Sequence, residues 1–361
     1  MRNGYVPWVL RSIAYGLSAA LLYYVLSDAQ LGQLGRDLVS MNWGWVAVAV
    51  ALGAGVNLAE TVRWQWVLRP VAKLPYWSSA RAVFAGLFAN EAFSLHAGGL
   101  LRCYMLSRNN KDLPFSVSIA GGLIGRIFEG FWWLPSMLVV IRLVPLPPEF
   151  QFLKPFMNRM AIVVIASNAL LAVFLFRRDK NAADLPASGW RRQLRILITD
   201  LRLICHSRFF GYAFLLSFPL LLIPSLPIWT AFHAYGLNLS LGTAVSLMLL
   251  LRIGSSFPQA PGNLGIFQFL TRVCLEKIFH IAAPEAARFS LVLWGIVTLP
   301  VIIGGAVSLG IEGLSLRQLR QAAQEDLRPA AQAELRSDPP GDLVDPESTR
   351  RTAAAAADSY L

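Results

Sequence analysis

Apolar residues in this chain fall into long runs, and those runs predict helices that cross a membrane. A membrane-spanning helix needs about 20 mostly apolar residues, and runs of this length recur along most of the sequence. The predicted spans are about 8–26, 43–62, 115–141, 156–176, 209–235, 239–257 and 285–311. The pattern therefore predicts an all-α, polytopic membrane helix bundle over residues 1–316, with about seven to nine membrane segments.

Two further apolar stretches, 82–101 and 258–281, are interrupted by residues that do not continue a regular helix. The interrupting residues are Asn90, Glu91, Gly98 and Gly99 in the first stretch, and Pro258, Pro261 and Gly262 in the second. Such breaks free backbone groups, which a membrane tolerates only inside protein or against a water-filled cavity. We expect broken or re-entrant segments that line one cavity. Their similar layout suggests an internal repeat, and paired interrupted segments point to the binding site of a transporter.

Composition agrees with a membrane protein. Hydrophobic residues make up 55% of the chain and charged residues 15%, whereas a soluble domain carries about 25% charged residues. The 32 Lys and Arg outnumber the 21 Asp and Glu, and in a membrane protein that excess belongs first to cytoplasmic loops. We therefore expect an integral protein of a bacterial-type inner (plasma) membrane, without a nucleic-acid partner.

The positions of the basic residues predict the orientation of the chain. Segments 63–81, 102–112 and 177–208 are rich in Lys and Arg, which favours the cytoplasmic side, and segments 27–42 and 142–155, with fewer bases, are expected outside. Arg317, Arg320 and Arg328 follow the last span, so the C-terminus is also expected in the cytoplasm. The same orientation places the N-terminus in the cytoplasm. Seven spans would instead put the two ends of the chain on opposite sides of the membrane. Either one broken stretch crosses while the other re-enters, or the Pro-rich 209–235 stretch is two elements.

Two segments lie outside the predicted membrane helices. Residues 190–205 place apolar side chains on one helical face and arginines on the other. This pattern fits a cytoplasmic amphipathic helix in the plane of the lipid head groups and, equally, a solvated helix packed on the bundle. Residues 317–361 are rich in Ala, Pro, Asp and Arg, and we expect this C-terminal tail to be disordered.

Charged side chains at depth are the candidate functional residues, because charges inside a membrane are costly and mark functional sites by default. They are Glu60, Arg63, Glu91, Arg126, Glu129 and Arg252. One interpretation is that Glu60–Arg63 and Arg126–Glu129 form internal ion pairs that fix helix packing, which we favour for the first pair. For Arg126 and Arg252 we favour a functional role, because surplus buried guanidinium groups require an anion. A phospholipid or polyprenyl phosphate head group is the anion available in a bilayer.

Motifs of soluble catalysis are missing from the sequence. No GxxxxGK[ST], GxSxG or HExxH pattern occurs. Their absence argues against a P-loop nucleotide-binding site, the nucleophile elbow of an α/β-hydrolase and a zinc protease site. Cys103, Cys205 and Cys274 are too far apart for a zinc site or a disulfide framework. We therefore predict no catalytic residues, no enzyme activity, no metal and no cofactor.

Four short segments together resemble the lysylphosphatidylglycerol synthase transmembrane-region family, the flippase-like domain. The segments are Glu60–Leu68, similar to its "RW…L" segment; Asn90 through Gly98-Gly99 to Arg102 and Arg108, similar to "N…GG…R"; Ser118 to Arg126, similar to "S…R"; and Ser256 to Phe267, similar to "P..PGG.G". The resemblance runs from about residue 8 to 311. Leu100, Gly125 and Gln268 stand where acids are often found in the family.

The resemblance implies that the chain translocates, or assists translocation of, a phospholipid or a polyprenyl-linked lipid between leaflets. The predicted substrate-binding residues are Arg63, Glu91, Gly98, Gly99, Arg102, Arg126, Glu129, Arg252, Pro258, Pro261 and Gly262. Two alternatives remain open. One is a membrane glycosyltransferase that uses a polyprenyl-phosphate sugar, with Asp28 and Asp37 as its external acids. The other is a non-transporting regulator of a lipid-synthesis enzyme that acts through 177–208.

Overall fold

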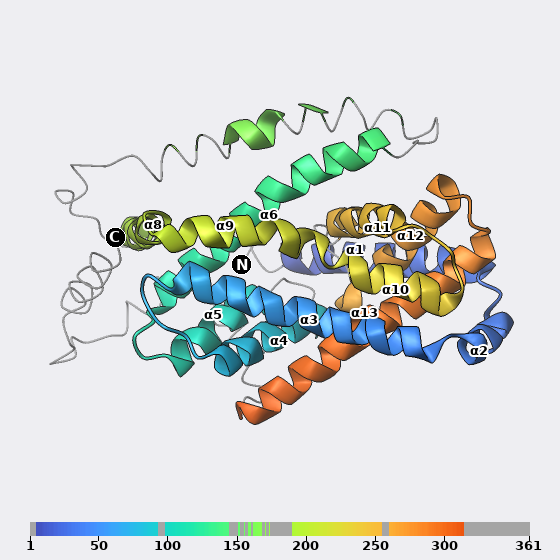
Figure 1. Ribbon diagram of the computed structural model, residues 1–361, viewed down its shortest axis with the longest axis horizontal. Helices are drawn as coiled ribbons and strands as arrows, with labels where there is room; N and C mark the ends of the chain where they lie inside the picture. The colour runs from blue at the N-terminus through green and yellow to red at the C-terminus, as the bar shows by residue number, and fades with distance from the viewer. Residues whose placement is uncertain are drawn as a thin grey trace.

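The computed structural model describes residues 5–92, 98–143, 190–254 and 260–313, with short pieces between 151 and 173. These residues form helices joined by short turns, and no strand occurs among them (Figure 1). The helices are α1 Tyr5–Asp28, α2 Leu31–Ser40, α3 Trp43–Leu68, α4 Tyr76–Ala92, α5 Gly98–Asn109, α6 Phe115–Leu143, α8 Trp190–Cys205, α9 Arg208–Leu222, α10 Ser225–Tyr235, α11 Leu241–Gly254, η2 Pro261–Asn263, α12 Ile266–Val273, η3 Cys274–Ile278 and α13 Ala283–Ile311. The predicted all-α membrane bundle is confirmed.

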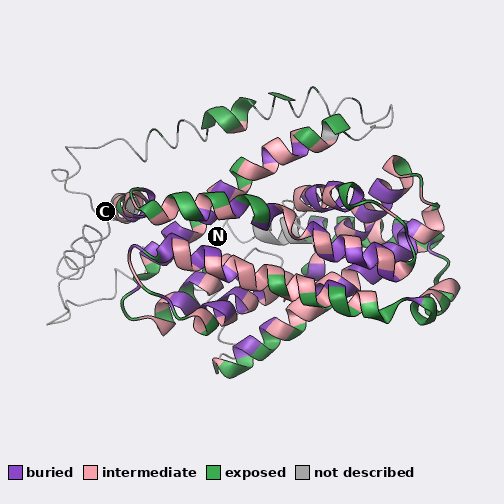
Figure 2. Cartoon of the chain, in the orientation of Figure 1, coloured by how far each residue is buried: buried purple, intermediate pink, exposed green. Residues whose placement is uncertain are grey.

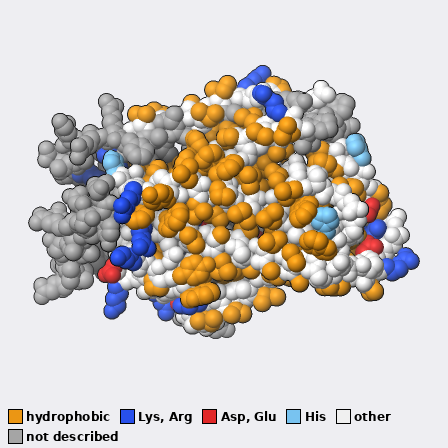
Figure 3. All heavy atoms as spheres, in the orientation of Figure 1, with side chains coloured by type: hydrophobic (Ala, Val, Ile, Leu, Met, Phe, Trp, Pro, Cys, Tyr) orange, Lys and Arg blue, Asp and Glu red, His pale blue; other side chains and the backbone are white. Residues whose placement is uncertain are grey.

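Among the described residues, four helical segments are long and apolar enough to cross a membrane. They are α3, most of α6, α9 together with α10, and α13, and they coincide with the predicted spans 43–62, 115–141, 209–235 and 285–311. The Pro-rich segment is indeed two helices, which join at Pro224. Helix α1 covers the predicted span 8–26, and most of 156–176 lies outside the described residues. Apolar side chains cover the middle of the face shown in Figure 3, with charged side chains towards both ends.

The first broken stretch is a re-entrant hairpin. Helix α4 runs from one end of the molecule to its middle, and α5 packs against it and returns (Figure 1). The two ends of the hairpin meet, because Asn109 Nδ2 at the end of α5 donates to Ser78 Oγ at the start of α4 over 3.1 Å. The chain therefore does not cross the membrane here.

The second broken stretch forms a comparable hairpin with α11 as one arm and η2, α12 and η3 as the other. Helix α11 has 14 residues, a length of about 21 Å, which is too short for a hydrocarbon core of about 30 Å. It packs against α12. The structure therefore differs from the prediction of a separate span over 239–257. An apolar run of that length serves a hairpin arm as well as a span.

The two hairpins enter from opposite ends of the molecule, with α4 and α5 towards the end where α3 finishes and α11 and α12 towards the end where α3 begins (Figure 1). Each is flanked by long helical segments, in the order α3–α4–α5–α6 and α9/α10–α11–α12–α13. Two copies of one element order in opposite orientation are the arrangement of an inverted repeat. Neither hairpin carries the chain from one end of the bundle to the other.

Buried apolar residues form one large cluster around each hairpin (Figure 2). The first cluster joins α4 and α5 to α3, α6, α8 and α9, and the second joins α11 and α12 to α3, α6, α10 and α13. The predicted helix over 190–205 exists as α8. Its Leu201 and Ile204 are buried in the first cluster, so this helix packs on the bundle. The tail 317–361 lies outside the described residues.

The predicted cytoplasmic segments 63–81 and 102–112 share one end of the molecule with the end of α13. Arg81 Nε lies 2.5 Å from Glu312 Oε1, and Asn109 Nδ2 lies 3.0 Å from Glu312 Oε2. At the other end Asp37 of α2 binds Arg288 and Tyr235. The C-terminal end of the bundle therefore lies on the same side as the basic segments, as the orientation prediction requires.

Cysteine labelling tests which end is cytoplasmic. In a background without the three native cysteines, we expect Ser40→Cys to react with a membrane-impermeant maleimide in intact cells. Lys111→Cys at the opposite end should react only after permeabilisation, because the basic end stays in the cytoplasm. Both positions are exposed. Labelling of Lys111→Cys in intact cells, with Ser40→Cys protected, would establish the opposite orientation.

Candidate functional site

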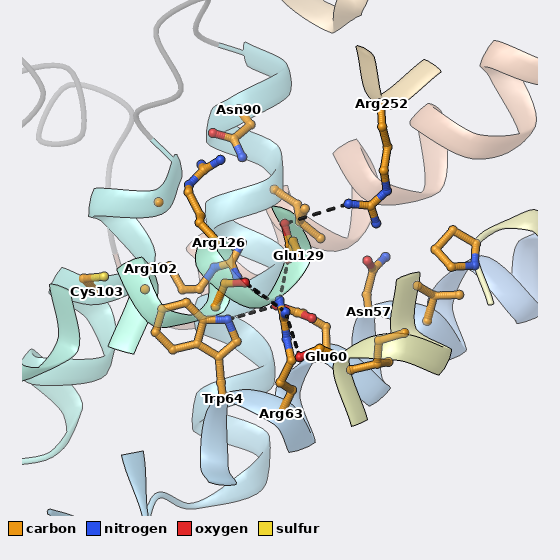
Figure 4. Close-up of a pocket in the computed structure, with 18 of the residues that line it drawn as sticks. Asn57, Glu60, Arg63, Trp64, Asn90, Arg102, Cys103, Arg126, Glu129 and Arg252 are labelled. Carbon is orange, nitrogen blue, oxygen red and sulfur yellow. Dashed lines mark hydrogen bonds and ion pairs between the residues drawn. The ribbon is translucent and has the colours of Figure 1, made fainter. Parts of the chain in front are cut away.

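A cavity of about 570 Å³ lies inside the bundle where the two hairpin tips meet. Helices α3, α4, α5, α6 and α9 form its walls, together with Arg252 of α11 and the second hairpin tip (Figure 4). Its charged and amide-bearing lining residues are Asn57, Glu60, Arg63, Asn90, Glu91, Arg102, Arg126, Glu129, Arg252 and Asn263. Four arginines against three glutamates leave one positive charge in excess.

Arg63 is the centre of an ion-pair network on one wall of the cavity. Its Nη2 lies 2.5 Å from Glu60 Oε1 and 2.5 Å from Glu129 Oε1. Its Nη1 donates to the carbonyl of Gly125 over 3.3 Å and to Ser217 Oγ over 3.4 Å. One buried guanidinium thus joins α3, α6 and α9. Because both terminal nitrogens of its guanidinium are engaged by protein groups, with Nε alone unpartnered among the described residues, we interpret Arg63 as a residue that holds the wall in place.

Contacts between helices, more than spacing along one helix, decide which charged residues of the cavity form ion pairs. The Glu60–Arg63 pair is present as predicted. The Arg126–Glu129 pair is absent among the described residues, because the carboxylate of Glu129 is taken by Arg63 and approached by Arg252, whose Nη1 lies 3.8 Å away. The structural interpretation of Arg126 as an internal ion-pair partner is therefore wrong.

Arg102 and Arg126 have fewer partners than Arg63 among the described residues. Arg102 Nη1 lies 3.5 Å from Glu60 Oε1, and its guanidinium stacks over the Trp64 ring at 5.1 Å. Its Nε is buried without a hydrogen-bond partner in the described part of the chain. The described residues also offer Arg126 no hydrogen bond or ion pair, although it lines the cavity. Guanidinium groups with spare donors, such as that of Arg102, can bind a phosphate. Arg102, Arg126 and Arg252 face the cavity from three different elements (Figure 4).

The two broken stretches meet at this cavity through residues next to the predicted ones. Glu91 at the first tip accepts from Asn263 Nδ2 at the second, with its two oxygens 3.2 and 3.3 Å away. Gly99, Ala260 and Asn263 line the cavity. The sequence thus correctly predicts that both breaks face one cavity, although not by the same residues throughout.

Several predicted residues do not line the cavity. Gly98 packs against Gly86, and its N–H donates to Asn90 Oδ1 over 3.0 Å. Gly262 is buried beside Trp294, whose Nε1 donates to its carbonyl over 2.6 Å. Pro261 is exposed away from the lining, and Pro258 lies outside the described residues. These positions shape the hairpins, whereas their neighbours face the cavity.

Three asparagines line the cavity although they are not among the substrate-binding residues predicted from the sequence. They are Asn57, Asn90 and Asn263. An amide inside an apolar run carries a desolvation cost unless it is hydrogen-bonded, and that signal is present at Asn57 in the second predicted span and at Asn90 in the first broken stretch. Asn263 gave no such signal, because Pro-Gly-Asn is also an ordinary turn sequence.

Outside the cavity, the two acids of the first predicted external segment are paired with arginines. No group of three or more His, Cys, Asp or Glu side chains gathers among the described residues. Asp28 is bound by Arg272 Nη2 over 2.6 Å and Asp37 by Arg288 Nε over 2.5 Å. These two pairs tie α1 and α2 to α12 and α13.

A family model described as Lysylphosphatidylglycerol synthase TM region matches residues 11–305. The match includes every wall of the cavity and both hairpins. No curated protein sequence matches the chain.

Proposed function

Because the chain belongs to the lysylphosphatidylglycerol synthase transmembrane-region family, we propose that it translocates, or assists the translocation of, a lipid with an anionic head group between membrane leaflets. The family and the apolar helices make it a membrane protein involved in lipid handling. The observation that carries the finer proposal is the cavity between the hairpin tips, in which arginines outnumber carboxylates. Excess guanidinium charge at that depth favours a phosphate-bearing ligand.

The roles of the arginines follow from their partners. Arg102, Arg126 and Arg252 hold the phosphate of the head group, since all three line the cavity and Arg102 keeps a buried Nε without a hydrogen-bond partner among the described residues. Arg63 keeps Glu60 and Glu129 in place. A phospholipid and a polyprenyl phosphate share this head-group chemistry, so either fits the cavity, with the hydrocarbon chains left in the bilayer.

The hairpins suit movement of such a ligand between leaflets. In transporters with inverted repeats, substrate sites lie near the middle of the membrane between the repeats, and each repeat can close one side. Here the hairpins enter from opposite ends and meet at the cavity. A shift of one hairpin against the other would expose the head group to one leaflet at a time.

The two alternative functions, a glycosyltransferase and a regulator of a lipid-synthesis enzyme, can be separated from translocation by experiment. The two acids proposed for a glycosyltransferase, Asp28 and Asp37, are bound to Arg272 and Arg288, and their replacement by asparagine should leave lipid movement intact. A regulator would act only in the presence of its enzyme. Vesicles that contain this protein alone therefore separate a translocator from a regulator.

Arg126→Ala tests the proposed function directly. In vesicles of phosphatidylcholine with acyl-labelled fluorescent phosphatidylglycerol, wild-type protein should accelerate exchange between leaflets, measured by dithionite quenching. Arg126→Ala should slow it by about tenfold or more, because one charge-assisted hydrogen bond contributes about 1.5–3 kcal/mol. Arg36→Ala is the control, since Arg36 is an exposed residue of α2 far from the cavity lining. Equal exchange by both variants would contradict a head-group role for Arg126.

A further inference from the structure

One carboxylate of the cavity is bonded differently from the other two. Glu60 and Glu129 bind arginines at 2.5 Å. The Glu91 carboxylate accepts from the neutral amide of Asn263 at 3.2 and 3.3 Å, and among the described residues no Lys or Arg forms an ion pair with it. A carboxylate inside a membrane protein that lacks a cationic partner and faces a cavity is a candidate for proton transfer.

The bond between Glu91 and Asn263 also joins the two hairpin tips. On its other sides the second tip is attached to different helices: the N–H of Ala260 donates to Ser18 Oγ of α1 over 3.0 Å, and Trp294 of α13 binds the carbonyl of Gly262. Asn263 has a left-handed backbone, with φ of 56°, and from there its side chain reaches α4. The protonation state of Glu91 therefore bears on whether the hairpins stay together.

We propose that Glu91 takes up a proton when an anionic head group enters the cavity and releases it when the head group leaves. This inference rests on the proposed function. It adds that proton binding at Glu91 is coupled to binding of the head group. On uptake, a proton from the solvent forms an O–H bond with one carboxylate oxygen. That oxygen then becomes a donor and only the other oxygen still accepts from Asn263, so the contact between the tips is weakened. The lining also gains one positive charge, which favours the anion.

The other charged and titratable groups around Glu91 do not compete for this proton. Those that face the cavity are Glu60 and Arg63 from α3, Arg102 and Cys103 from α5, Arg126 and Glu129 from α6, and Arg252 from α11. The arginines keep their charge. Glu60 and Glu129 are paired with arginines, and Cys103 Sγ donates to the carbonyl of Ser118. Arg81 and Glu312, from α4 and α13, bind each other at the far end of the hairpin.

Thermodynamic linkage makes the proposal measurable without a transport assay. If lipid binding takes up a proton, then a lower pH must strengthen lipid binding by the same coupling. For one proton the dissociation constant changes by up to about tenfold per pH unit. The head group and the proton thus enter together.

Calorimetric titration of the detergent-purified protein with dioctanoyl-phosphatidylglycerol tests this coupling. Titrations in two buffers of different ionisation enthalpy give the number of protons exchanged on binding. We expect wild-type protein to take up protons, and to bind more tightly at pH 5.5 than at pH 8. Glu91→Gln should bind with no proton uptake and no such pH dependence. Asp112→Asn, a carboxylate removed from an exposed turn, should behave like the wild type.

The outcomes separate this inference from the proposed function. Proton uptake that persists in Glu91→Gln, or tight binding by the wild type with no uptake, overturns the proton role and leaves head-group binding intact. Failure of the wild-type protein to bind the lipid overturns both. If Glu91→Gln does not fold, Asn263→Ala takes its place: it keeps the carboxylate and removes its amide partner, so the pH profile of binding should move. An unchanged profile in Asn263→Ala overturns the inference.

Discussion

Arg63→Ala is expected to prevent stable folding, because it leaves two inward-facing carboxylates without their shared cation. The side chain of Arg63 is 4% exposed and lies 2.5 Å from both Glu60 and Glu129. Removing one partner from a buried ion pair costs about 3–5 kcal/mol, and here two carboxylates lose their partner at once. Proteins are stable by only about 5–15 kcal/mol. The melting temperature and the gel-filtration profile of the purified variant should show the loss.

A matched set of variants separates loss of the cation from loss of packing. Arg102→Ala removes an arginine that lines the same cavity but lies 3.5 Å from Glu60, so it should fold with a much smaller change in melting temperature. Combining Arg63→Met with Glu60→Gln and Glu129→Gln removes Arg63 together with both of its carboxylates and should recover part of the stability, because neutral groups avoid the desolvation cost. A fully stable Arg63→Ala protein would show that the network does not hold the wall together.

The helices of this protein were readable from the sequence because the membrane imposes a simple rule on them. Apolar runs predicted α3, α6, α9 with α10, and α13, and the polar, Gly and Pro interruptions predicted two broken stretches. Hydropathy alone could not distinguish a span from a hairpin arm, so 239–257 was assigned as a span. That distinction depends on α12 folding back on α11, which is a tertiary contact.

The candidate site was predictable in its residue types but not in its pairings. Spacing of three residues along a helix correctly joined Glu60 to Arg63 and wrongly joined Arg126 to Glu129. Glu129 faces Arg63 from α3 and Arg252 from α11, and no local pattern encodes which helices will meet. The same limit applies to Asn263, which reaches Glu91 across 172 positions in the sequence.

Gly98 and Gly99 are adjacent in the sequence, yet substitution at each should have opposite consequences for folding. A Cβ at Gly98 would lie 1.8 Å from the carbonyl oxygen of Gly86 and 2.6 Å from Asn90 Oδ1. Backbone of α4 cannot move away from this contact without separating α4 from α5, so Gly98→Ala should abolish the folded hairpin. Poor expression and aggregation in gel filtration would be the expected result. A monodisperse Gly98→Ala protein with an unchanged melting temperature would contradict the close approach of the two helices.

Gly99→Leu should instead give a folded protein that handles lipid poorly. A Cβ at this position has Arg126 Nη2 as its nearest contact, at 3.8 Å, and Gly99 lines the cavity. A leucine there would fill space beside Arg126 and exclude the head group from it. Loss of one charge-assisted bond of about 1.5–3 kcal/mol should slow lipid exchange by about tenfold or more. Gly262→Leu is a poor partner for this test, because its φ of 72° strains any side chain. If Gly99→Leu folds and exchanges lipid at the wild-type rate, the cavity is not the path of the head group.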